Sequence, residues 1–158
     1  MSYLVPYGLA LTLKPGEEIF FRALFFPNEP DIPTDTYQLL ESYCPNPDCH
    51  CQEALLEVIS ATSRKWVADI RVSLDPDEKP NPRLGLFEDT APYVQALFKK
   101  IAQNLNKDLS YLDRLRAHYN QVKAVAADPS HPAHSRVIKW GNTGGPPSSP
   151  NKSKRKRH

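Results

Sequence analysis

The sequence predicts an α+β fold: an antiparallel sheet of about four to five strands, a C-terminal helical hairpin packed on one face of the sheet, and a disordered tail. Three observations support this prediction. Short apolar runs and turn residues fill the first half of the chain, two helical patterns follow residue 91, and the last 18 residues are rich in Pro, Gly, Ser and basic residues. A chain of 158 residues fits one domain, which we place at residues 1–140, with the tail at residues 141–158.

The first two strands are expected to form a β-hairpin. Residues 9–13 alternate in polarity and size, Pro15 and Gly16 provide a turn, and residues 19–26 form the second, antiparallel strand of the hairpin. Because the returning run is apolar on nearly both faces, we expect a central strand or one covered by a partner. The apolar spacing in residues 34–43 favours a short helix that leads into the cysteines.

Three further segments are strand candidates. Residues 54–62 and 66–74 are joined by a short polar turn, and residues 84–87 follow as an edge strand after a proline-rich loop. Strict alternation in residues 66–74 predicts a half-buried antiparallel strand. Its buried face is expected to carry Trp66, Ala68, Ile70, Val72 and Leu74.

Two helices are expected after the strands. Pro92 suits the first turn of a helix, where its missing N–H leaves no bond unmade, and Asp108 can cap a second helix. Val137, Ile138 and Trp140 are expected to dock as a last short element. The apolar faces of the two helices are Val94, Leu97, Phe98, Ile101 and Leu105 in the first and Leu112, Leu115, Tyr119 and Val122 in the second.

The most informative segment is the run from Tyr43 to Cys51, which holds all the cysteines of the chain: Cys44, Cys49 and Cys51. An odd number of thiols at such close spacing does not suit a disulfide framework, and two prolines stiffen the loop between the first two cysteines. Zinc binds thiolates tetrahedrally at about 2.3 Å. Three idle thiols are the alternative, but the intervening Pro, Asp and His residues make a poor apolar patch, so we predict a structural zinc.

A closed zinc site needs a fourth ligand. At about 100° per residue, His118 lies about 60° from Leu115, on the flank of the apolar face of its helix, from which it could reach the cysteine loop. His50 lies between two ligating cysteines, where simultaneous coordination would be strained. The candidates are His50, Asp48, His118, His131 and His134, and the predicted ligand set is Cys44, Cys49, Cys51 and His118.

The run Tyr-Cys-Pro-Asn-Pro-Asp-Cys-His-Cys, together with residues 114–119, resembles uncharacterised bacterial proteins that share a Tyr-Cys-Pro-x-Pro-Asp-Cys-x-Cys metal-binding signature. It is also distantly similar to the cysteine-rich metal-binding motifs appended to bacterial SecA proteins, although the spacing differs and the Gly-Ser-Gly centre of that motif is absent. The resemblance implies a metal held by Cys44, Cys49 and Cys51, and it implies no activity.

The charge of the chain is divided unevenly. The net charge is +2, but the last 18 residues hold five basic residues and no acid, so residues 1–140 carry 15 basic and 18 acidic residues. A flexible cluster of this kind favours nucleic acid or another polyanion as partner, since each phosphate contact releases counterions. A solubilising terminus without a partner, or a nuclear address, is the alternative. The basic residues are Lys152, Lys154, Arg155, Lys156 and Arg157.

Composition and motifs exclude several classes of function. No apolar run reaches the roughly 18–20 residues of a membrane span, and the first residues lack a basic signal-peptide region, so a cytoplasmic protein is expected. Motifs for phosphate binding, nucleophilic serine or His-Glu-x-x-His chemistry are missing from the sequence. We therefore expect a non-catalytic, zinc-stabilised binding or adaptor protein. Two alternatives remain open: a protein–protein interaction module, and a metal-dependent enzyme with Asp48 or Glu53 as base.

Overall fold

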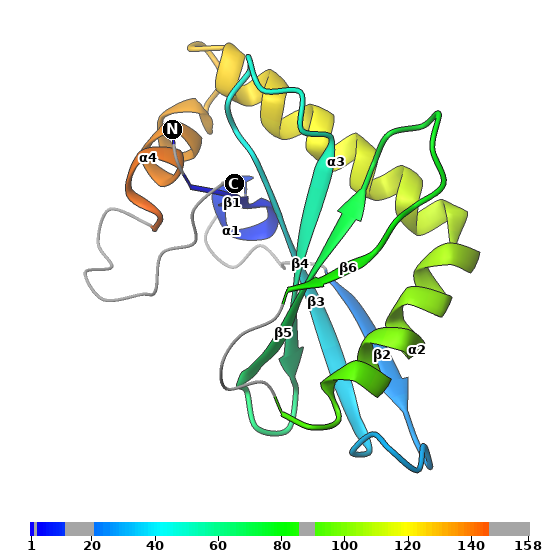
Figure 1. Ribbon diagram of the computed structural model, residues 1–158. Helices are drawn as coiled ribbons and strands as arrows, with labels where there is room; N and C mark the ends of the chain where they lie inside the picture. The colour runs from blue at the N-terminus through cyan, green and yellow to red at the C-terminus, as the bar shows by residue number, and fades with distance from the viewer. Residues whose placement is uncertain (2, 12–20, 86–90, 146–158) are drawn as a thin grey trace.

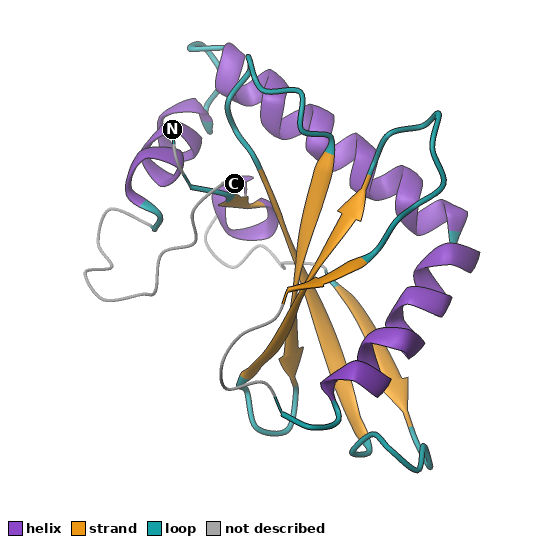
Figure 2. Cartoon of the chain, viewed as in Figure 1, coloured by secondary structure: helices purple, strands orange, loops and turns teal. Residues whose placement is uncertain are grey.

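The computed structural model describes residues 1, 3–11, 21–85 and 91–145 and confirms the α+β class (Figures 1 and 2). An antiparallel sheet is followed in the chain by three helices, and two of these cover one face of the sheet. The strands are β1 (Val5–Pro6), β2 (Arg22–Phe26), β3 (Asp35–Tyr43), β4 (Glu53–Ser60), β5 (Trp66–Ser73) and β6 (Arg83–Gly85). The helices are α1 (Tyr7–Leu11), α2 (Val94–Lys107), α3 (Leu109–Ala127) and α4 (His134–Thr143).

The sheet is an antiparallel meander from β2 to β6, with β1 added at one corner. β2 and β1 share one edge of β3: β2 pairs with its first half, where Phe26 is opposite Asp35, and β1 with its last residues, where Val5 is opposite Tyr43. The predicted strands at 54–62 and 66–74 are confirmed as β4 and β5. The edge strand is confirmed as β6, and residues 86–87 of that prediction lie outside the described residues.

The predicted N-terminal hairpin is wrong where the structure describes it. Residues 9–11 belong to the short helix α1, β2 starts at Arg22, and β2 pairs with β3 instead of with an earlier strand. The remainder of the predicted hairpin, residues 12–20, lies outside the described residues.

The predicted short helix at residues 34–43 is also wrong, because this segment is β3, the longest strand described. Tyr37, Leu39 and Tyr43 are buried in the main core together with α2 and α3, as a strand period of two requires. The fourth member of that face is Glu41, which is only 7% exposed. A buried acid in the apolar series concealed the strand period from sequence analysis.

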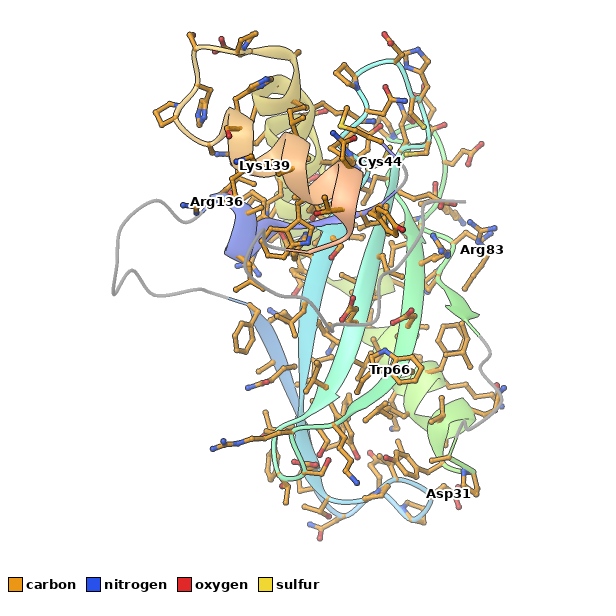
Figure 3. The ribbon with its side chains drawn as sticks, turned by 90° about the vertical axis from the view of Figure 1, so that its left-hand side faces the viewer. Asp31, Cys44, Trp66, Arg83, Arg136 and Lys139 are labelled. Atoms are coloured by element: carbon orange, nitrogen blue, oxygen red, sulfur yellow. The ribbon has the colours of Figure 1, made fainter. Side chains whose placement is uncertain are left out.

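A bulge changes one face of β5. Ile59 pairs with Trp66 and Val58 with Ala68, so the register shifts by one residue at Val67. Trp66 therefore leaves the core face that strict alternation predicted. Its Nε1 donates to Asp69 Oδ1 at 2.7 Å, on the face of the sheet opposite α2, which is turned toward the viewer in Figure 3.

The two predicted helices are confirmed as α2 and α3, which meet at an angle at Asp108 (Figure 1) and do not fold back on one another as a hairpin. The apolar side chains predicted for α3 are all buried, as are those of α2 except Phe98, which is partly buried against the same core. Asp108 caps α3, because its carboxylate accepts a hydrogen bond from Tyr111 N at 3.0 Å. The main core of the protein lies between these helices and the inner face of the sheet.

The boundary predicted at residue 140 falls inside α4, which continues to Thr143 and ends at Gly144 in the left-handed conformation. The first part of the predicted tail is therefore folded, and its remainder, residues 146–158, lies outside the described residues. α4 lies beside β1 and α1 (Figure 1), and Tyr3 N donates to Gly141 O at 3.1 Å. A second, smaller core joins these elements to α3 and contains Val5, Ala10, Val125, Ala126, Ala133, Val137 and Trp140.

Candidate metal centre

Cys44, Cys49 and Cys51 come together in the loop between β3 and β4. Their Sγ atoms all lie within 4.8 Å of one another, with Cys44 buried and the other two half-buried. In a tetrahedral zinc site with bonds of about 2.3 Å, sulfur atoms lie about 3.8 Å apart. The three thiols therefore fit a thiolate-binding metal such as zinc with little rearrangement.

Local turn chemistry brings the cysteines together. Asn46 O accepts from Cys49 N at 3.1 Å, and the Asn46 side chain accepts from Asp48 N at 3.0 Å, so the residues between Cys44 and Cys49 form a tight turn. Gln52 then adopts a positive φ of 44°, and its carbonyl accepts from Leu74 N at 2.7 Å. These bonds direct the chain back into β4 immediately after Cys51.

Helix α3 holds the loop from the core side. Lys123 Nζ donates to Asn46 O at 2.5 Å and to Cys49 O at 2.9 Å, and it lies 5.2 Å from the centre of the Tyr119 ring. The Tyr119 hydroxyl accepts from Gln52 N at 3.2 Å. A positive charge here favours thiolates, because three thiolates around a divalent ion leave one excess negative charge.

Helix α4 touches the loop at one position. A Cβ built on Gly141 would lie 2.8 Å from Pro45 Cγ, closer than any ordinary contact, so only glycine allows this approach. Pro45 is buried and follows Cys44 directly. In Figure 3, Cys44 accordingly lies at the end of the sheet over which α4 passes. The cysteine loop is thus the place where the sheet, α3 and α4 meet.

The protonated thiols stabilise one another. Hydrogen bonding to Cys44, followed by burial, raises the pKa of the Cys51 thiol, while the positive charge of Lys123 lowers it. Burial also raises the pKa of the nearby Tyr119 hydroxyl to about 12, so this tyrosine is neutral at physiological pH. A metal ion must displace the thiol protons, so its binding is expected to weaken as the pH falls.

The structure does not bring His118 into the group of three cysteines. The His118 ring instead hydrogen-bonds through Nδ1 to Glu41 Oε1 and stacks on the Tyr7 ring, with centroids 3.7 Å apart and planes 10° from parallel. Glu41 also accepts from the Tyr43 hydroxyl at 3.1 Å. The helical periodicity correctly predicted that His118 faces the sheet. Its partner there is Glu41, the buried acid of β3, and not the cysteine cluster.

The other candidate ligands lie in two places. His50 and Asp48 are exposed on the cysteine loop itself. His131 lies in the turn before α4, where its Nδ1 accepts from Ala133 N at 3.0 Å, and His134 is the first residue of α4, where its Nδ1 bonds to Val125 O at 2.9 Å. Within the described residues, none of these four joins the three thiols in a common ligand group.

Sequence analysis missed Lys123 as a partner of the loop. One signal was available: Lys123 lies four residues after Tyr119, on the same side of α3 and one turn further along. The basic residues predicted to bind nucleic acid, residues 152–157, lie outside the described residues.

The fold and site define an α+β protein with a three-cysteine cluster that can hold a metal ion. Comparison with models of protein families, with curated proteins and with solved structures finds no match to this chain. Among the described residues, no helix combines the length and the apolar character that crossing a bilayer requires.

Proposed function

We propose that this protein is a zinc-stabilised binding protein whose basic C-terminal residues contact nucleic acid or another polyanion. The observation that carries the first half of the proposal is the convergence of three Sγ atoms within 4.8 Å at the junction of the sheet, α3 and α4. Zinc at this junction would cross-link the loop through its three thiolates, so its binding free energy would add directly to folding stability.

The polyanion half of the proposal is supported by charge. Arg136 and Lys139 lie one turn apart on α4 and project from the same end of the molecule in Figure 3. The five basic residues at 152–157 follow this helix along the chain, whereas residues 1–140 have an excess of acids. Positive charge is therefore concentrated at and beyond α4, which favours phosphate contacts that depend on salt and not on sequence.

Metal content tests the first half. Purified protein should contain about one zinc per chain, and Cys49→Ser should lose it. A protein that binds no divalent metal at neutral pH under reducing conditions would contradict the proposed metal centre.

Truncation tests the second half. A chain that ends at Gly145 keeps α4 and its cap, so it should melt like the full chain but bind duplex and single-stranded DNA and RNA far more weakly. Full-chain affinity should also fall steeply between 50 and 200 mM salt, by about tenfold or more for a few phosphate contacts. Equal binding by the truncated chain would contradict the role of the basic residues.

One observation favours a second function, as a protein-interaction module. Phe25 in β2 is 60% exposed, and in the register of the sheet it lies on the face opposite the main core. Phe25→Ser should leave stability nearly unchanged, since an exposed side chain contributes little to the core, and should weaken capture of a protein partner. Unchanged capture would exclude this strand as the interface.

A further inference from the structure

A polar pocket of about 300 Å³ opens beside the cysteine cluster. Its wall includes Cys51 with the neighbouring His50 and Glu53, Asp75 and Glu78 from the β5–β6 connection, and Arg83 of β6. A second cavity of only about 10 Å³ also reaches Cys44 and Cys51. Cys51 therefore belongs both to the cysteine cluster and to the wall of a pocket large enough for a small molecule.

The part of the chain that the structure describes supplies three ligand atoms to this centre. Within the described residues, no histidine or carboxylate lies close enough to all three thiols to complete a set of four. Three protein ligands with one position left for an external group are the usual arrangement of zinc sites that bind exchangeable ligands. The pocket gives such a group its route to the metal.

The charge of the pocket selects the ligand. Glu53 is balanced by Arg83 and by Arg71, whose Nη1 lies 3.9 Å from Glu53 Oε2. No salt bridge within the described residues balances Asp75 or Glu78. The pocket thus favours a cation and opposes a carboxylate ligand, while a thiolate-rich centre favours a soft donor atom.

We infer that this pocket binds small aminothiols: the sulfur would occupy the fourth position on the metal, and the ammonium group would lie near Asp75 and Glu78. The thiol proton passes to solvent as the metal–sulfur bond forms, and no electrons are transferred. This inference rests on the proposed metal centre and adds to it a ligand class.

Cobalt-substituted protein of all 158 residues tests the inference, because the visible spectrum of tetrahedral cobalt reports each change of ligand. Cysteamine should shift the spectrum in a saturable way, and the cobalt should remain with the protein after desalting. The neutral analogue 2-mercaptoethanol should bind more weakly. Because the two thiols differ in intrinsic acidity, the informative quantity is the ratio of their affinities in wild type compared with variants.

Glu78→Gln should lower the ratio of cysteamine affinity to 2-mercaptoethanol affinity about fivefold. This is the contribution of one nearby pair of opposite charges in a water-like medium. The matched control is Asp77→Asn, which removes an acid from the same loop outside the pocket wall and should leave the ratio nearly unchanged. An equal fall in both variants would reduce the effect to net charge and overturn the inference.

Two other outcomes would also overturn it. If His50→Ala alone changes the cobalt spectrum in the absence of thiol, the protein supplies its own fourth ligand. If cobalt binds stoichiometrically but no thiol changes its spectrum, or if thiols only extract the metal, the pocket is not a ligand site. In all these cases the proposed metal centre itself is not contradicted. Failure to bind cobalt or zinc at all would refute the proposed function first.

Discussion

Glu41 and His118 form a hydrogen-bonded pair between β3 and α3, beneath the stacked ring of Tyr7. The carboxylate is 7% exposed, and its other hydrogen-bond donor is the buried Tyr43 hydroxyl. A buried acid of this kind is stable only while its partners are present, because an unpaired charge in the core is costly. This pair ties the centre of the sheet to α3, α1 and the residue that precedes the first cysteine.

Replacement of His118 separates its structural role from metal binding. His118→Ala should lower the free energy of unfolding by about 1–3 kcal/mol, because Glu41 loses a partner and Tyr7 loses its stacked ring. Zinc content and the cobalt spectrum should be unchanged. Asn120→Ala, on the exposed side of the same helix, is the control and should have little effect on either measurement. A changed cobalt spectrum in His118→Ala would restore histidine as the fourth ligand.

Replacement of Lys123 tests the support of the cysteine loop. Lys123→Met should weaken zinc affinity about tenfold, since it removes two hydrogen bonds to the loop backbone and the charge that offsets three thiolates. Competition with a chromophoric chelator measures the affinity. Lys99→Met, in the exposed part of α2, keeps the same change of net charge and should leave zinc affinity unaltered. Equal weakening in both variants would attribute the effect to overall charge.

The contact between α4 and the cysteine loop predicts that alanine substitutions at two glycines differ in their effect on stability. Gly141→Ala forces its new methyl group against Pro45 and should destabilise the protein by about 1–3 kcal/mol, with weaker zinc binding as a secondary effect. Gly145→Ala meets no atom within 4 Å and should be nearly neutral. Thermal melting of the two variants decides the matter, and similar melting temperatures would mean that α4 does not press on the loop.

Zinc and the Cys49 side chain should contribute to folding stability through one interaction, the bond between them. Removal of zinc from wild type by a chelator should lower the melting temperature by several degrees, at about 2–4 °C for each kcal/mol in a protein of this size. Cys49→Ser should melt near the temperature of the zinc-free wild type, and the chelator should then have no further effect. Additive losses would show that Cys49 stabilises the fold independently of the metal.

Much of the fold could be predicted because its patterns are local. The helix cap at Asp108 and the apolar face from Leu112 to Val122 depend on residues one or two turns apart, and both are confirmed. The cysteine cluster could be predicted for the same reason, since its three members lie within one loop.

The failures arose where distant residues decide the outcome. Glu41 can lie on the core face of β3 because it hydrogen-bonds His118, which is 77 residues away in the chain. Trp66 changes face because β5 has one extra residue, Val67, in its pairing with β4, and this bulge shows only in the register of the two strands. The hydrogen bonds from Lys123 to the cysteine loop depend on the position of α3 over the loop, 74 residues from Cys49, whereas the spacing from Tyr119 gives only the side of the helix on which Lys123 lies.

The second core has a consequence for the order of folding. It contains Val5 and Ala10 from one part of the chain and Val137 and Trp140 from another, more than 120 residues later. During synthesis, β1 and α1 can pair with β3 early, but Val5 and Ala10 gain their cover from Val137 and Trp140 only after α4 has emerged. The cysteine loop lies next to both groups of elements. We expect the affinity of a growing chain for zinc to rise when α3 docks and to reach its full value only when α4 docks, so complete metal loading would mark the end of folding.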